Sequence, residues 1–410
     1  MRPTETVSGL ADFDRRGPGT DAERRAATWL ADGLVKTGRD ARIEPFWCRP
    51  NWAVAHVWHI ALAIAGSLIA IPSPTAGAVV VAIALISTLA DATVGISPGR
   101  RLSPERASQN VVATPPTAST QVRSPVKLIV TANYDAGRAA LAYRPAFRRP
   151  VAALRHAFAG RPPGWIAWET LAITWLLATS ILRIDGVSKQ TVGAIQLIPD
   201  VGLLIGFALL IDLAGASWSP AAGDNASGVA LAIAIAAAID AAPPPGISVE
   251  IVLAGAGEGG GIGLRKYLRA NRRELQPSNA IVLGIAASGG GRPRWWVSDG
   301  PFVPLRYSAT LRRLCKRVAD DEPHLNTGEH RGRGATPALP ARARRLPAIA
   351  IGCVDDRGLA PRSHQPTDSP ESIDQAALDD ALQFALMLVD EIGEYVEQNP
   401  VSPAATSTPA

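Results

Sequence analysis

The order of hydrophobic and polar positions along the chain separates four long apolar runs from segments of mixed character. The runs cover residues 52–71, 78–94, 165–182 and 195–216. Crossing a bilayer takes about 20 apolar residues, so each run is long enough to span a membrane. Short connections join the runs in pairs, which predicts two transmembrane hairpins, over residues 52–95 and 164–216. Buried helices of a soluble core are the alternative, but the basic segments beside both pairs favour the membrane.

The rest of the chain alternates between strand-like and helix-like segments. Runs typical of strands occur at residues 41–46, 110–113, 126–132, 248–254, 280–285 and 348–352. Apolar positions at helical spacing follow Thr20 and Asp21, which can cap a helix that stops at Gly38, and further helices are predicted over about 226–241 and 373–397. This alternation predicts an α/β fold, with a mostly parallel or mixed sheet and helices on both faces.

The hairpins divide this predicted α/β domain into three pieces. The pieces are residues 1–51, 96–163 and 217–397. The last residues, 398–410, are rich in Ser, Thr, Pro and Ala, and we expect them to be disordered. The sequence therefore predicts one discontinuous soluble domain joined to four transmembrane helices.

Composition and charge restrict the class of protein. The 410 residues are 47% hydrophobic and 19% charged, which excludes a globally disordered chain. The three cysteines, Cys48, Cys315 and Cys353, are too few and too far apart for a disulfide framework or a cysteine-rich zinc module. The net charge of +5 comes mostly from arginine, and no nucleic-acid-binding motif accompanies it, so we expect no nucleic-acid partner.

The arginines predict how the protein lies in the membrane. If the apolar runs pair as hairpins, the side that holds the polar domain carries Arg49, Arg100, Arg101, Arg106, Arg144, Arg148, Arg149, Arg155 and Arg161. The other side carries only Arg183 and Lys189, against Asp185. The positive-inside rule then predicts an integral membrane protein with a cytoplasmic soluble domain and the lipid bilayer as a partner. Asp200 is a candidate for a transport role, although we favour a place at a helix end for it.

Four polar segments next to predicted strands and helices hold the candidate chemistry. They contain Asn133 with Asp135, Asp224, Glu258 and His364. In such sheets, ligands bind at the carboxyl ends of the strands, so two carboxylates and an imidazole could meet there and hold a divalent metal, usually zinc. The alternatives are structural: Asp224 as a helix N-cap, Glu258 as a solvated loop carboxylate and His364 as a locally bonded loop histidine.

The order of these segments resembles metallopeptidase family 28, the zinc exopeptidases of the aminopeptidase and glutaminyl cyclase type. The similarity runs from the opening helix through VTANYDAG, PAAGDNASGVAL and VLAGAGEGGGIGLRKYL to SHQPTDSPESID. It spans nearly all of the polar chain, and the GDNASG loop and the H-x-P-x-D-x-P-E-x-I-D ending are its most specific parts. The resemblance implies a zinc-exopeptidase fold interrupted by the two hairpins.

Carried over residue by residue, the resemblance implies that part of the family's two-metal site is degenerate. Two positions of first-metal ligands hold Asn133, in place of the family's His, and Gly284, in place of its Asp. The position of the general base, a Glu in the family, holds Gly257. Asp135 is retained and counts as a supporting residue, since in the family it orients the missing His.

The ligands that the resemblance assigns to the second metal are all present. They are Asp224, Glu258 and His364, and with water as a fourth ligand they would hold one zinc ion at most. Without its base the site lacks a group that is typically worth about 10²–10⁴-fold in rate. We therefore expect a pseudopeptidase that binds a peptide or a partner protein. The alternative is an active single-zinc aminopeptidase or acyltransferase on short peptides.

Overall fold

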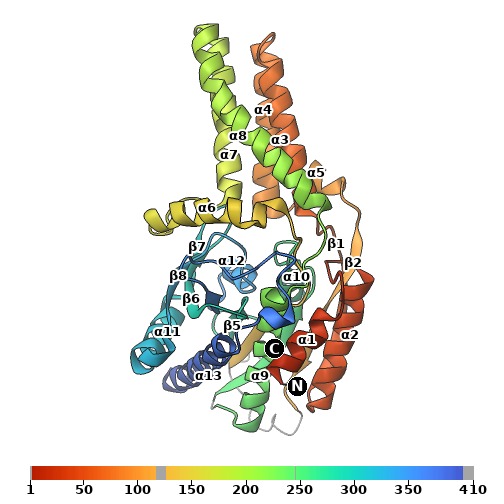
Figure 1. Cartoon of the computed structure of the whole chain (residues 1–410), viewed down its shortest axis with the longest axis vertical. Coiled ribbons are helices and arrows are strands. Elements are labelled where there is room, and N and C mark those ends of the chain that lie inside the picture. The colour runs from red at the N-terminus through yellow and green to blue at the C-terminus, as the bar shows by residue number, and fades with distance from the viewer. Residues whose placement is uncertain (1, 117–125, 245, 400–410) are drawn as a thin grey trace, which may run out of the picture.

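The computed structural model describes residues 2–116, 126–244 and 246–399, and it consists of an α/β domain with a bundle of long helices standing on one end (Figure 1). Both hairpins leave the α/β domain and return to it at this end, as the pairing of the apolar runs predicts. The predicted disordered tail, 398–410, lies outside the described residues from residue 400 onward.

A mixed sheet of nine strands forms the centre of the α/β domain. The strand order is β1-β2-β4-β3-β5-β9-β6-β7, and β8 pairs with β6. The strands are β1 Asp40–Cys48, β2 Arg106–Thr114, β3 Val126–Asn133, β4 Ile247–Ala254, β5 Ala280–Ile285, β6 Arg292–Asp299, β7 Leu305–Arg306, β8 Gly328–Arg331 and β9 Ala348–Val354. Neighbours among β4, β3, β5 and β9 are parallel, whereas β1, β2 and β6 join the sheet antiparallel. The predicted mixed α/β sheet is confirmed.

The four parallel strands are those with continuous apolar sequence, because helices cover the sheet and leave almost no strand residue in water. Along β5 and β9 every residue is buried. The sequence pattern misses β6, since Arg292, Pro293 and Arg294 open it and break the apolar run that Trp295 begins. It also misses β7 and β8, which are only two and four residues long.

Helices and short helical turns cover the sheet. They are α1 Pro3–Ala11, α2 Asp21–Lys36, α9 Ser227–Ala241, α10 Ile262–Ala270, α11 Ala309–Asp321, α12 Leu339–Ala343 and α13 Gln375–Gln398, with the turns η2 Leu141–Tyr143, η3 Ala222–Ala226, η4 Pro323–Leu325 and η5 Pro370–Ser372. The predicted cap of α2 is present, since Thr20 Oγ1 accepts the backbone N–H of Glu23 at 3.2 Å. Helix α9 packs on β3 and β4, and α13 packs on α9, β6 and β9.

The four apolar runs form the long helices of the bundle. These are α3 Trp52–Ile69, α4 Pro74–Val94, α7 Trp165–Ile184 and α8 Lys189–Gly215. Helix α3 packs on α4 and α8, and α7 packs on the same two helices. Side chains such as Ile60, Val81, Ile173 and Leu203 form a core of their own, separate from the core of the α/β domain. The bundle is therefore a second packed unit.

Within the described residues, five helical segments are long and apolar enough to cross a membrane, one more than the sequence predicts. Four belong to the bundle, and their most apolar windows are 22–44% buried. The fifth, Ala222–Ala241, includes α9 and is 78% buried, because the sheet and α13 surround it. Burial thus separates a core helix from the four helices whose apolar side chains face outward.

The expectation that Asp200 lies at a helix end is wrong. Helix α8 begins at Lys189, before the apolar run itself, so Asp200 falls about three turns inside the helix. There its Oδ2 accepts a hydrogen bond from Ser67 Oγ of α3 at 2.9 Å. Asp200 thus ties the two hairpins together.

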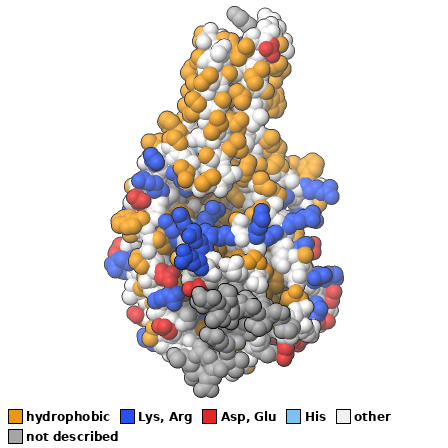
Figure 2. Space-filling view, turned by 180° about the vertical axis from the view of Figure 1, so that it is seen from behind, with side chains coloured by type: hydrophobic (Ala, Val, Ile, Leu, Met, Phe, Trp, Pro, Cys, Tyr) orange, Lys and Arg blue, Asp and Glu red, His pale blue; other side chains and the backbone are white. Residues whose placement is uncertain are grey.

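Two short helices lie where the bundle meets the α/β domain: α5 Pro98–Arg101 and α6 Pro145–Ala157. Helix α6 runs crosswise at the foot of the bundle (Figure 1). Phe147, Val151 and Leu154 on α6 are exposed, at the spacing of one helix face. On the face that Figure 2 shows, the bundle carries mostly hydrophobic side chains, and Lys and Arg side chains form a band where it joins the domain.

Candidate metal site

The predicted site residues meet at the carboxyl ends of the parallel strands. Asn133 is the last residue of β3, and Glu258 lies in the loop between β4 and α10. Asp224 lies in η3, immediately before α9, and His364 lies in the loop between β9 and η5. Four segments that are far apart in the sequence therefore supply one site.

His364 lies close to both carboxylates that the sequence pairs with it. Its Nε2 is 3.3 Å from Glu258 Oε2 and 3.7 Å from Asp224 Oδ2. The ring stacks on Tyr143, with the two centroids 4.1 Å apart, and its Nδ1 lies 3.3 Å from the backbone oxygen of Arg138. A bond from Nδ1–H to that carbonyl would leave Nε2 free to act as a ligand.

Two further aspartates hold the carboxylate loops in place. Asp135 accepts the backbone N–H groups of Gly257 and Glu258, both at 2.9 Å. Asp368 accepts the N–H groups of Gly223 at 2.7 Å and of Asp224 at 3.0 Å. Sequence reasoning finds Asp135 but misses the role of Asp368, although Asp368 is part of the ending motif.

The ligand positions are largely withdrawn from water. Burial, followed by the charge of Asp224, raises the pKa of Glu258 well above its usual range. Burial lowers the pKa of His364, although the charge of Asp224 acts in the opposite direction. Burial also raises the pKa of Asp135 to about 7, against its two backbone hydrogen bonds.

Gly257 and Gly284, where the family resemblance places a Glu and an Asp, are closely surrounded by other residues. A side chain at Gly257 would overlap Asn133, since an added Cβ would lie 2.6 Å from the Asn133 Cβ and closer still to its Cγ. A side chain at Gly284 would meet Ala338, with the added Cβ 2.6 Å from the Ala338 Cβ. Neither Gly257 nor Gly284 could therefore carry a side chain unless its neighbours moved.

The remaining side chains are of the types that bind a divalent metal ion. Asp224, Glu258 and His364 supply two carboxylates and an imidazole, a set that zinc accepts with one position left open. Asp135 and Asp368 act on the backbone of the carboxylate ligands, which is the usual place for supporting residues around a metal.

A cavity of about 1970 Å³ lies between the bundle and the α/β domain, and the site opens into it. Trp52 and His56 of α3 line the cavity together with Glu258 and His364. Trp52 Nε1 donates a hydrogen bond to the backbone oxygen of Glu258 at 3.1 Å. The first bundle helix thus contacts a loop of the candidate metal site, which no motif in the sequence indicates.

Comparison with known proteins identifies the fold. Residues 211–389 match the model of peptidase family M28. A zinc aminopeptidase from Bacillus subtilis has a similar structure, with 13% identity and a TM-score of 0.56 over 95% of this chain and 94% of that chain. The glutaminyl cyclase of Porphyromonas gingivalis has 13% identity and a TM-score of 0.53 over 95% and 97% of the two chains. The Legionella pneumophila LapA aminopeptidase has 11% identity and a TM-score of 0.52 over 96% of this chain and 71% of that chain. None of the curated proteins compared with this chain matches its sequence.

Proposed function

We propose, from the premise that residues 211–389 of this chain belong to peptidase family M28, that the protein is a membrane-anchored pseudopeptidase. In this account it holds one divalent metal ion, most readily zinc, at Asp224, Glu258 and His364. Its cavity binds a peptide or a segment of a partner protein without cleaving it.

The observation that carries the proposal is the packing of Asn133 against Gly257. The base position of the family not only lacks a carboxylate but also has no room for one, because Asn133 fills the space. Asp135 is fully buried, does not line the cavity and supports the Gly257–Glu258 backbone, so it is not placed to take the role of the base. A metal site without a positioned base supports binding better than hydrolysis.

The surface of the bundle supports insertion of α3, α4, α7 and α8 into a membrane. Large apolar side chains such as Leu68, Ile86, Trp168 and Leu197 are more than half exposed, and contiguous apolar surface of this kind marks contact with a membrane or a partner. The exposed apolar face of α6, beside Arg148 and the other arginines of the junction, supports an interfacial position for α6.

The orientation follows from the same band of charge. Lys and Arg gather at the domain end of the bundle, and the positive-inside rule assigns that end to the cytoplasm. A reporter enzyme fused after Ala410 tests this assignment. Activity of a cytoplasm-specific reporter is expected, and activity of an export-specific reporter alone would reverse the orientation.

The metal content of the purified protein tests the site. Wild-type protein is compared with Asp224→Asn and His364→Gln, two substitutions that keep side-chain size while weakening the ligand. Each variant should contain about one ion per chain fewer than wild type, because each removes one of only three protein ligands. His324→Gln is the matched control, because His324 is an exposed histidine in the turn η4. Its metal content should equal that of wild type. Equal metal content in all four proteins would overturn the proposed site.

A single-zinc aminopeptidase or acyltransferase is the second candidate, favoured by the completeness of the three-ligand set. Bound zinc can polarise a carbonyl group and lower the pKa of a coordinated water. Within the chain, His364 and the two carboxylates would then position the ion next to the cavity. Turnover of aminoacyl substrates separates this candidate from the pseudopeptidase, since both predict the same metal content.

A further inference from the structure

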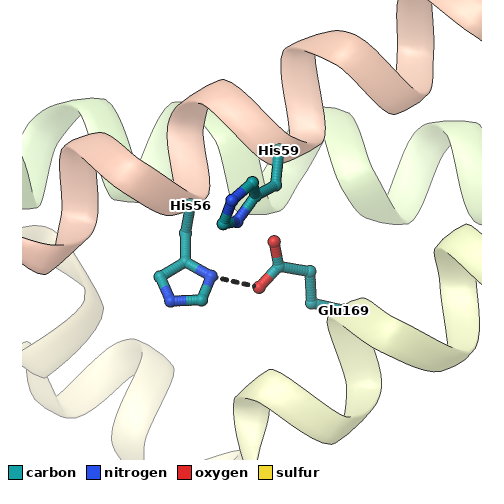
Figure 3. Close-up of side chains that lie close together, drawn as sticks. All are labelled: His56, His59 and Glu169. Atoms are coloured by element: carbon teal, nitrogen blue, oxygen red, sulfur yellow. Dashed lines mark hydrogen bonds and ion pairs between the residues drawn. The ribbon is translucent and has the colours of Figure 1, made fainter. Parts of the chain in front are cut away.

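A second group of metal-ligating side chains lies inside the bundle, away from the family site. His56 and His59 come from consecutive turns of α3, and Glu169 comes from α7 (Figure 3). The three side chains point toward one another, and one ligand atom from each lies within 4.8 Å of the others. His56 Nδ1 and Glu169 Oε2 are 2.7 Å apart.

This cluster is buried and incompletely bonded. His56, His59 and Glu169 are 2%, 0% and 6% exposed. Neither ring nitrogen of His59 has a hydrogen-bond partner within the described part of the chain, and Glu169 Oε1 has none either. A buried polar group without a partner costs about 1–3 kcal/mol, so three such atoms in one cluster require an explanation.

No lysine or arginine next to Glu169 balances the charge of its carboxylate within the described part of the chain, because Arg100 pairs with Asp91 instead. Arg100 donates to both oxygens of Asp91, at 2.6 and 3.1 Å, and neutralises that carboxylate. His56 Nε2 is 3.7 Å from Asp91 Oδ2 on its other side. No lysine or arginine forms an ion pair with Glu169 among the residues that the structure describes.

A proton on His56 is the simplest alternative account of the cluster. An imidazolium would pair with Glu169 on one side and with Asp91 on the other. It would still leave both nitrogens of His59 and one oxygen of Glu169 without partners. Protonation therefore accounts for the contacts of His56 with the two carboxylates but for none of the three unpartnered atoms.

We propose that His56, His59 and Glu169 bind a divalent transition-metal ion of the zinc class. Two imidazoles and one carboxylate form a known zinc ligand set, with the fourth position open to water or substrate. Ligand atoms on a tetrahedral zinc lie roughly 3.4 Å apart, given metal–ligand distances of about 2.1 Å. Atoms within 4.8 Å of one another reach that arrangement by small rotamer shifts. The ion would give a partner to one ring nitrogen of His59 and to Oε1 of Glu169.

The site would join the two hairpins. Two ligands belong to α3 of the first hairpin and one to α7 of the second. The ion would therefore bridge two helices whose ligands His56 and Glu169 are 113 residues apart in the sequence. At the domain end of the same helices, the rings of Trp52 and Trp165 pack 4.9 Å apart. Trp52 also donates a hydrogen bond to the loop that carries Glu258. A metal ion that joins α3 to α7 would therefore hold in place the helix that contacts the family site.

Elemental analysis of the full-length protein in detergent, with any affinity tag removed, tests the proposal. Manganese, iron, cobalt, nickel and zinc are measured in wild type, His59→Gln and Glu169→Gln after dialysis against micromolar zinc. Each variant should contain about one ion per chain fewer than wild type, and His324→Gln should match wild type. A chelator should lower the thermal unfolding temperature of wild type more than that of His59→Gln.

The His364→Gln background separates this site from the family site. If both sites bind metal, His364→Gln and His59→Gln each lose about one ion, and the double variant loses both. Loss in His364→Gln alone would overturn the bundle site and leave protonated His56 as the account of the cluster. Loss in His59→Gln alone would support the bundle site and overturn the family site. If His59→Gln fails to fold, Glu169→Gln, which keeps the shape of the side chain, gives the same readout, and Asp224→Asn does so for His364→Gln.

Discussion

Replacing Gly257 with alanine tests whether packing has closed the base position. The added Cβ would lie 2.6 Å from the Cβ of Asn133, whereas carbon atoms in favourable contact are about 3.5–4.0 Å apart. Rotation of the Asn133 side chain can move its Cγ but not its Cβ, which is fixed to β3. Overpacking of this kind typically costs about 1–3 kcal/mol, so we expect Gly257→Ala to destabilise the protein by that amount.

A double-mutant cycle isolates the overlap from other effects of the substitution. Asn133→Gly removes the Cβ, so Gly257→Ala should cost almost nothing in that background. The coupling free energy between the two positions should then be about 1–3 kcal/mol. Asn133→Ala is the matched control, because it keeps the Cβ and should leave most of the cost in place.

Urea unfolding of the detergent-solubilised protein, followed by circular dichroism, measures these differences. Additive effects, with a coupling below about 0.5 kcal/mol, would refute the reasoning, since independent sites add to within that limit. Such a result would mean that the backbone of the loop adjusts freely and that the base position could be refilled.

Three other predictions concern parts of the molecule outside that pair. Burial, followed by the charge of nearby arginines, lowers the pKa of His330 from 6.5 to about 4, so protonation of this side chain favours the unfolded state. The thermal stability of the protein should therefore fall as the pH drops from about 6.5 toward 4. His330→Gln should remove up to about 3 kcal/mol of this pH dependence. A nitroxide label on a cysteine that replaces Val151 of α6 should, in liposomes, be relaxed more by oxygen, which enters the bilayer, than by a water-soluble nickel complex. A label that replaces Arg313 of α11 should show the reverse. Equal accessibility of the two labels would contradict an interfacial α6. Trp52→Phe removes the hydrogen bond to the Glu258 carbonyl and should weaken zinc binding by about fivefold, equivalent to about 1 kcal/mol. A competition titration with a chromophoric chelator measures the affinity. An unchanged affinity would show that α3 does not support the site.

Much of the fold follows from the sequence because hydrophobic periodicity decides it. The parallel strands and the four bundle helices are continuous apolar segments, and such segments have few alternatives to strands or long helices. Helix α6 is missed because Pro150 and several arginines interrupt its apolar face, which is visible only once the helix is placed beside the bundle. Strand β6 is missed because Arg292, Pro293 and Arg294 interrupt the apolar pattern at its start.

The two candidate metal clusters differ in how far sequence reveals them. Asp224, Glu258 and His364 are found because they stand in segments that resemble a family, and the fold brings their side chains together. The cluster of His56 and Glu169 carries no motif, because α3 reads as an apolar run and the partner residue lies on another hairpin. Only the spacing of two histidines on one face of α3 hints at it. Tertiary contact supplies the rest.

The rate of aminoacyl-peptide hydrolysis at saturating zinc tests the central claim most directly. The claim is that the chain keeps a metal site but has no place for a general base. Wild-type protein, assayed against a panel of aminoacyl p-nitroanilides and dipeptides, should turn over no faster than His364→Gln. Turnover at least tenfold above that variant, dependent on added zinc, would contradict the account and identify a working peptidase.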